Sequence, residues 1–167
     1  MQAIVYHGNK DIRLDDIPEP VTGSGEVKLR VTNASICATD IEEWQYGPLW
    51  VQHGSPNKLT GRQTPLVLGH EISGHIVELG QGVNSVAIGD RVVVNNVRTC
   101  GTCFWCTRGE QAVCPNMAVA GFMADGGLQD FMTWPADHVI VLPESISDEE
   151  APLIEPATVA VHGVRRS

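Results

Sequence analysis

Four closely spaced cysteines are the strongest chemical signal in this sequence of 167 residues. Cys100, Cys103 and Cys106 follow one another at intervals of three residues, and Cys114 lies eight residues further on. Four thiolates at such spacings can surround one metal ion and leave no open coordination position, which is typical of a structural zinc site. An iron–sulfur centre is the alternative metal site, and a set of buried free thiols is the alternative without a metal.

A second, scattered set of residues could hold a catalytic zinc. It consists of Cys37, of His70 with the adjacent Glu71, and of Glu155. One thiolate, one imidazole and one carboxylate, with water in the fourth position, form a ligand pattern suited to catalytic zinc. Each residue taken alone also has an ordinary structural role, as a buried thiol, a core histidine or a helix-capping carboxylate. The residues by themselves therefore leave the catalytic site open.

Composition narrows the class of protein. The chain has 11 Lys+Arg against 20 Asp+Glu, a net charge of −9, and it is 43% hydrophobic and 19% charged. This composition indicates a globular protein, and the acidic charge argues against a nucleic-acid partner. No apolar run approaches the roughly 18 residues of a membrane-spanning helix, and residues 1–10 lack the apolar stretch of a secretory signal. We therefore expect a cytoplasmic protein with reduced cysteines and without a membrane partner.

The elements that must position these residues are mostly short strands. Apolar or alternating patterns predict them at residues 2–6, 12–17, 27–31, 92–94 and 139–142. The 17 glycines and 10 prolines interrupt these runs at short intervals, which favours a small all-β barrel. Residues 48–65 are polar and aperiodic, and they predict a long surface loop.

The one convincing helical region comes last. Residues 147–150 read as a capping box, and Arg165 and Arg166 place positive charge at the far end. Pro152 and Pro156 predict a division into two short helices, the second beginning near Ala157. The apolar face continues to the last residues, so we expect a further part of the protein to pack against it.

The order of these motifs along the chain resembles that in a known enzyme family. Residues 69–83, with the sequence GHEISGHIVELGQGV, resemble the zinc signature of the medium-chain alcohol dehydrogenases. The run 37–40 precedes this segment and the four-cysteine loop follows it, so the likeness covers nearly the whole chain. Glu155 stands where other members carry a second cysteine ligand, which points to the polyol branch of sorbitol, 2,3-butanediol and threonine dehydrogenases. The long loop at residues 46–65 is similar to an insertion of the butanediol enzymes.

The resemblance implies a mainly β fold. It implies a GroES-like, partly open β-barrel with short helices and a C-terminal helix, in which residues 1–146 form an incomplete catalytic zinc domain. Residues 147–167 would connect to an NAD(P)-binding Rossmann domain. The sequence has no Gly-x-Gly-x-x-Gly, so it lacks the pyrophosphate cradle of such a domain. We therefore expect NAD(P) to bind only through a domain outside this chain, and the chain alone to be inactive.

The resemblance also assigns roles to single residues. Cys37 and His70 match zinc ligands, and Glu71 and Glu155 are alternative or exchanging ligands. Successive residues of a strand point to opposite faces, so His70 and Glu71 can both bind one ion only at a bend or bulge. Thr39 matches the hydroxyl that relays the substrate proton, and Glu42 stands where many relatives carry a histidine of that relay.

The implied reaction is zinc-assisted hydride transfer from a secondary alcohol or vicinal diol to NAD(P). It requires two zinc ions per chain, one catalytic and one structural. The alternative to a dehydrogenase is a free-standing zinc-binding or interaction module without catalysis. Such a module requires only the structural zinc ion. A cysteine-rich nucleic-acid finger is disfavoured by the charge of −9. Because an unfinished barrel exposes strand edges, we also expect a homo-oligomer.

Overall fold

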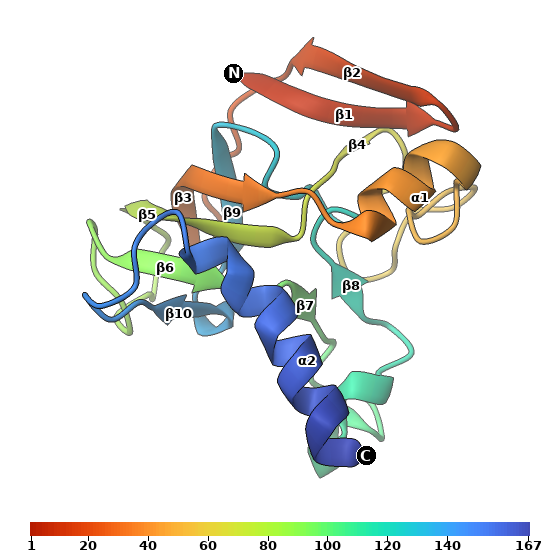
Figure 1. Ribbon diagram of the computed structural model, residues 1–167. Helices are drawn as coiled ribbons and strands as arrows, with labels where there is room; N and C mark the ends of the chain where they lie inside the picture. The colour runs from red at the N-terminus through yellow and green to blue at the C-terminus, as the bar shows by residue number, and fades with distance from the viewer.

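The larger of the two main antiparallel sheets carries most of the main apolar cluster. The computed structural model describes residues 1–167, and this sheet has the strand order β10-β6-β5-β3-β9 (Figure 1). Its strands are β3 (Glu26–Ser35), β5 (Glu71–Leu79), β6 (Arg91–Val94), β9 (Phe131–Pro135) and β10 (Val139–Val141). Val27 and Leu29 are fully buried in the main apolar cluster, while Arg30 is exposed, as the alternating pattern predicts.

The smaller sheet and a short ribbon complete the β structure. The smaller sheet has the order β2-β1-β4, with β1 (Gln2–Gly8), β2 (Asp11–Asp16) and β4 (Leu66–Val67). The ribbon pairs β7 (Val97–Arg98) with β8 (Ala118–Val119), and the segment between them carries the four cysteines. The strands form open sheets, and the prediction of a mainly β fold is confirmed. Residues 48–65 contain no helix or strand, as predicted.

Helix α1 (Ala38–Tyr46) is one of the short helices that the resemblance implies, although the sequence pattern indicates a helical region only at the end of the chain. Its two buried residues are Asp40 and Glu43, whereas Ile41 and Trp44 are exposed. Helices are recognised by an apolar stripe that faces the core. Because α1 buries carboxylates instead, its sequence carries no such stripe.

The C-terminal helical region begins earlier than its prolines suggest. A 3₁₀ turn at Ala151–Leu153 leads directly into α2 (Ile154–Arg166), so the predicted start near Ala157 is wrong by three residues. Pro156 lies in the first turn of α2, where no partner exists for a backbone N–H. The predicted capping box is present, since Ser147 N–H donates to the Glu150 carboxylate and Glu150 N–H to the Ser147 hydroxyl. No helix has the length and apolar character needed to cross a bilayer.

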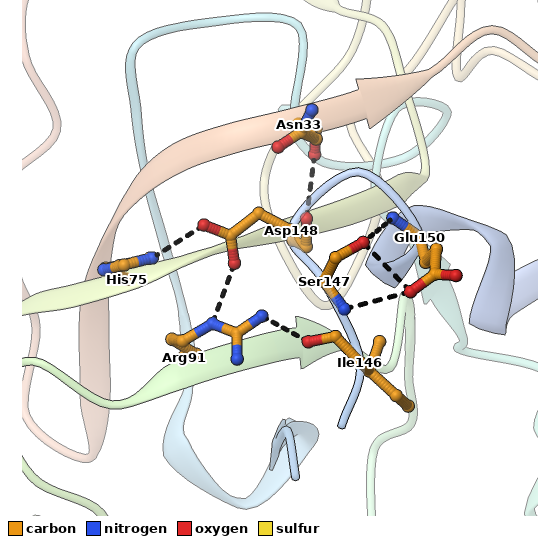
Figure 2. A network of polar contacts seen from close by, with 8 residues as sticks. Asn33, His75, Arg91, Ile146, Ser147, Asp148 and Glu150 are labelled. Atoms are coloured by element: carbon orange, nitrogen blue, oxygen red, sulfur yellow. Dashed lines mark hydrogen bonds and ion pairs between the residues drawn. The ribbon is translucent and has the colours of Figure 1, made fainter. Parts of the chain in front are cut away.

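Asp148 holds the segment before α2 against three strands of the larger sheet (Figure 2). Its Oδ1 accepts from Arg91 Nε on β6 at 2.8 Å, and its Oδ2 faces His75 Nε2 on β5 at 3.4 Å. The Asn33 side-chain amide on β3, with its nitrogen turned towards Asp148, donates to the Asp148 carbonyl at 3.2 Å. Arg91 also donates to the carbonyl of Ile146. These contacts fix the direction in which the chain enters α2.

We expect acid to release this segment from the sheet. The Arg91 hydrogen bond, followed by His75, lowers the pKa of Asp148 below the ordinary value of 3.8. A carboxyl with a lowered folded-state pKa stabilises the fold above its unfolded pKa, and this contribution is lost as pH falls through the folded-state pKa. Hydrogen-exchange protection factors of residues 146–151 should therefore decrease as pH falls below 3.8.

A pair of variants tests the same contact at neutral pH. Asp148→Asn should lower protection of residues 146–151, because the amide cannot replace the charged partner of Arg91. Glu149→Gln changes an exposed neighbour by the same chemistry and should leave protection unchanged. Equal protection in both variants would show that Asp148 does not hold the segment.

Candidate functional site

Cys37, His70 and Glu71 come together where two neighbouring strands meet. The sulfur, an imidazole nitrogen and a carboxylate oxygen of these residues all lie within 4.8 Å of one another. Cys37 is the N-cap of α1 just after β3, and β5 begins at Glu71. Because β3 and β5 are antiparallel partners with Ser35 opposite Glu71, the end of one strand lies beside the start of the other. We call these three residues the triad.

A bend at Gly69 allows both adjacent residues to join the triad. Gly69 has φ +91°, a left-handed conformation that side-chain-bearing residues rarely adopt. A Cβ atom at this position would lie 2.7 Å from Leu128 Cγ. His70 and Glu71 follow the bend and are only 6% and 5% exposed. Both consecutive side chains thus reach the same site directly after a left-handed glycine.

Gly69→Ala should destabilise the chain by about 2–5 kcal/mol, because it combines left-handed strain of about 1–2 kcal/mol with overpacking of about 1–3 kcal/mol. Gly82→Ala is the matched control, since Gly82 has φ +85° and open space around it. Denaturant unfolding should show only the strain in Gly82→Ala. Equal losses in the two variants would mean that the close contact with Leu128 has no energetic effect.

Asp40 connects two members of the triad. Its Oδ2 accepts the Cys37 backbone N–H at 2.9 Å, and its Oδ1 lies 3.7 Å from His70 Nδ1. Burial raises the pKa of Asp40, and the charge of Glu71 acts in the same direction, while Cys37 and His70 oppose the shift. A buried acid thus lies behind the imidazole, where it can orient the ring.

The residues around the triad fit a bound metal ion. Thr39 Oγ1, Asp40 Oδ1 and His70 Nδ1 are buried polar atoms without a hydrogen-bond partner. Asp40 Oδ1 and His70 Nδ1 face each other at 3.7 Å, which is too long for a hydrogen bond. Buried polar atoms are nearly always paired, so the unpaired hydroxyl of Thr39 indicates a place for a ligand. A thiol, an imidazole and a carboxylate form a donor set that suits zinc.

The other predicted site residues lie at the edge of this group. Glu155 is outside the triad, and its Oε1 accepts from Asn96 Nδ2 at 3.0 Å. Thr39 follows Cys37 in the first turn of α1, whereas Glu42 is exposed on the same helix. Asn96 is a buried residue that the sequence patterns do not indicate. Its polar side chain two residues after the buried run Val92–Val94 is the available signal.

The four cysteines form a second compact group. Their sulfurs lie within 4.8 Å of one another, with separations of 4.0 Å for Cys100–Cys106, 3.9 Å for Cys103–Cys114 and 3.6 Å for Cys100–Cys114. A tetrahedral ion with metal–sulfur bonds of about 2.3 Å requires sulfur separations of about 3.8 Å. These thiols therefore fit one zinc ion.

The thiols differ in how readily they ionise. Backbone N–H groups of Thr102 and Cys103 lower the pKa of Cys100 to about 6. Desolvation and the neighbouring sulfurs raise the pKa of Cys106 to about 11. A central cation would offset this second effect, because it stabilises every thiolate around it.

Comparison with known proteins identifies the family. Residues 23–144 match the alcohol dehydrogenase GroES-like domain. The (R,R)-butanediol dehydrogenase of Bacillus subtilis is 35% identical over 171 residues, which cover 100% of this chain and 47% of that protein. The sorbitol dehydrogenase of the same organism is 33% identical over 168 residues, covering 100% of this chain and 45% of its own length.

A solved structure gives the same result. The crystal structure of 2R,3R-butanediol dehydrogenase from Bacillus subtilis has a TM-score of 0.93 and 34% identity, over 99% of this chain and 47% of its own. The chain thus spans about half the length of the curated relatives it matches. This chain belongs to the alcohol dehydrogenase family and contains its GroES-like domain, as the order of the motifs predicts.

Proposed function

We propose that residues 1–146 form the zinc-binding catalytic domain of an NAD(P)-dependent dehydrogenase that oxidises a secondary alcohol or vicinal diol. Residues 147–167 would connect it to the cofactor domain. The observation that carries this proposal is the convergence of Cys37, His70 and Glu71 within 4.8 Å beside unpaired buried polar atoms. The names of the butanediol and sorbitol dehydrogenases support an alcohol or diol as the substrate.

The proposed mechanism divides the work among a few side chains. Cys37, His70 and either Glu71 or Glu155 would hold a zinc ion, which would act as a Lewis acid on the substrate hydroxyl. Thr39 Oγ1, which is buried and unpaired, accepts a hydrogen bond from that hydroxyl and orients it. As Thr39 takes up the proton of the substrate hydroxyl, it passes its own hydroxyl proton to Glu42 of the same helix, and the exposed Glu42 carboxylate transfers that proton to water. Burial of His70 and Glu71 excludes water and strengthens these interactions.

Zinc content provides the test of this function. The purified chain should hold two zinc ions, one in the triad and one in the four-cysteine group. Cys37→Ser should reduce the content to one ion, because a serine hydroxyl is a poor zinc ligand at neutral pH. A content of one ion that Cys37→Ser leaves unchanged would reject the catalytic site and favour a zinc-binding module without catalysis.

The cysteines, the net charge and the sheet edges support proposals about the compartment and the partners of the protein. We propose a cytoplasmic protein, because reduced thiols are needed to bind the structural ion. The acidic charge of −9 disfavours a nucleic-acid partner. The exposed edges of the open sheets favour a homo-oligomer.

A further inference from the structure

Asn96 lies between the triad and the first turn of α2. It occupies the turn between β6 and β7 and is 6% exposed. Its Nδ2 donates to the backbone carbonyl of His70 at 3.2 Å and to Glu155 Oε1 at 3.0 Å. One amide group therefore joins the backbone of His70, just before β5, to the helix that carries Glu155.

The orientation of this amide is determined by its partners. A backbone carbonyl and a carboxylate are both acceptors, so only the NH₂ group of Asn96 can face them. The backbone around it is also held, because Asn96 O accepts from Ala120 N–H at 3.0 Å and Asn95 N–H donates to His138 O at 2.8 Å. The side chain thus extends from a fixed part of the chain.

The chemistry of asparagine suits this place. It offers two N–H donors without adding a charge, whereas serine offers one donor and lysine would neutralise Glu155. The amide therefore holds the Glu155 carboxylate near the His70 carbonyl without placing a cation beside it. Such outer partners commonly fix the groups around a metal and affect metal affinity by about 10–100-fold.

We propose that Asn96 is a positioning residue of the metal centre, which holds the Glu155 carboxylate beside the triad by bridging it to the His70 carbonyl. This inference rests on the proposed function, because it requires a metal ion in the triad. In this view, Asn96 is the residue that connects α2 to the metal centre. The segment fixed by Asp148 brings α2 close, and Asn96 sets the final position of Glu155.

Cobalt substitution tests the inference through a double-mutant cycle. Co²⁺ replaces zinc in the purified chain, and the spectrum of the Cys37→Ser chain, which retains the four-cysteine site, is subtracted. Asn96→Asp keeps the size of the side chain but replaces the donor with a charge that repels Glu155. We expect Asn96→Asp and Glu155→Gln to shift the visible bands in the same direction and each to weaken Co²⁺ binding about tenfold. The double variant should show no larger change than either single variant.

The outcomes separate this inference from the proposed function. Loss of all Cys37-dependent bands in the unchanged chain would reject the metal site itself. Two other results would reject only the role of Asn96. In the first, Glu155→Gln leaves the Cys37-dependent bands unchanged. In the second, Asn96→Asp has its full effect even in the Glu155→Gln chain. If Asn96→Asp does not fold, Asn96→Ser removes one donor without adding charge and enters the same cycle.

Asn95→Asp is the matched control. Asn95 is exposed, and its side chain accepts one hydrogen bond, from Val97 N–H at 3.3 Å. The variant adds the same charge one residue away and retains this acceptor. Its cobalt spectrum and affinity should equal those of the unchanged chain, and an effect equal to that of Asn96→Asp would assign the change to general charge rather than to the bridge.

Discussion

Cys106→Ser is expected to release one zinc ion and to unfold the loop between β7 and β8, while the sheets remain folded. Between Val97 and Met117 the only buried residues are Cys106 and Cys114. The loop therefore has no apolar core of its own, and the metal must supply most of its stability. Structural zinc contributes about 10–16 kcal/mol of apparent binding free energy in zinc-finger peptides.

The effect should be local. The main apolar cluster lies mostly on the strands of the larger sheet and includes none of the cysteines. Hydrogen exchange within residues 100–114 should approach that of an unfolded chain, and protease should cut there first. The far-ultraviolet signal of the sheets should persist.

A cysteine-to-serine change in the triad is the control for Cys106→Ser. Cys37→Ser also removes one thiol and, under the proposed function, one zinc ion. Because Cys37 lies at the start of α1, away from this loop in the sequence, exchange within residues 100–114 should stay slow. Slow exchange in the Cys106→Ser chain as well would mean that the loop does not depend on the metal.

Patterns that extend over a few residues predict much of this fold. Val27 and Leu29 alternate with polar residues, and the strand that they indicate is observed. The strand β5 carries no such pattern, because the first four of its residues are all buried. Helix α1 was not predictable from apolar spacing, since Asp40 and Glu43 occupy its buried face. Asp40 accepts the backbone N–H of Cys37 at the start of the helix, and Glu43 accepts that of Leu49 after its end, and apolar spacing indicates neither contact.

The candidate sites differ in the same way. The four-cysteine group is local in sequence, so its spacing alone indicates one site. The triad depends on the pairing of β3 with β5 and on the left-handed bend at Gly69. The Asn96–Glu155 contact joins residues 59 positions apart, and no spacing rule reaches that far. Family resemblance indicated Glu155, but only the structure places Asn96 against it.

Glu43→Gln should destabilise the chain by about 3–5 kcal/mol, which is large beside the 5–15 kcal/mol of an ordinary domain. Glu43 is 0% exposed, and its carboxylate accepts backbone N–H groups of Leu49, Trp50 and Val51 at 2.8, 2.8 and 3.3 Å. Glutamine keeps the volume but turns an NH₂ group towards these donors. At least one buried N–H then loses its partner, and the remaining hydrogen bonds lose their charge assistance.

Denaturant unfolding measures the loss, and Glu42→Gln provides the control on the exposed face of the same helix, where a change within about 0.5 kcal/mol is expected. Tyr6 reports on the charge independently of stability. Desolvation, followed by the charge of Glu43, raises the pKa of Tyr6 above 10.0. Glu43→Gln should therefore lower this pKa, while desolvation still keeps it above 10.0. An unchanged Tyr6 titration together with unchanged stability would mean that the buried carboxylate does not carry the charge that organises residues 47–51.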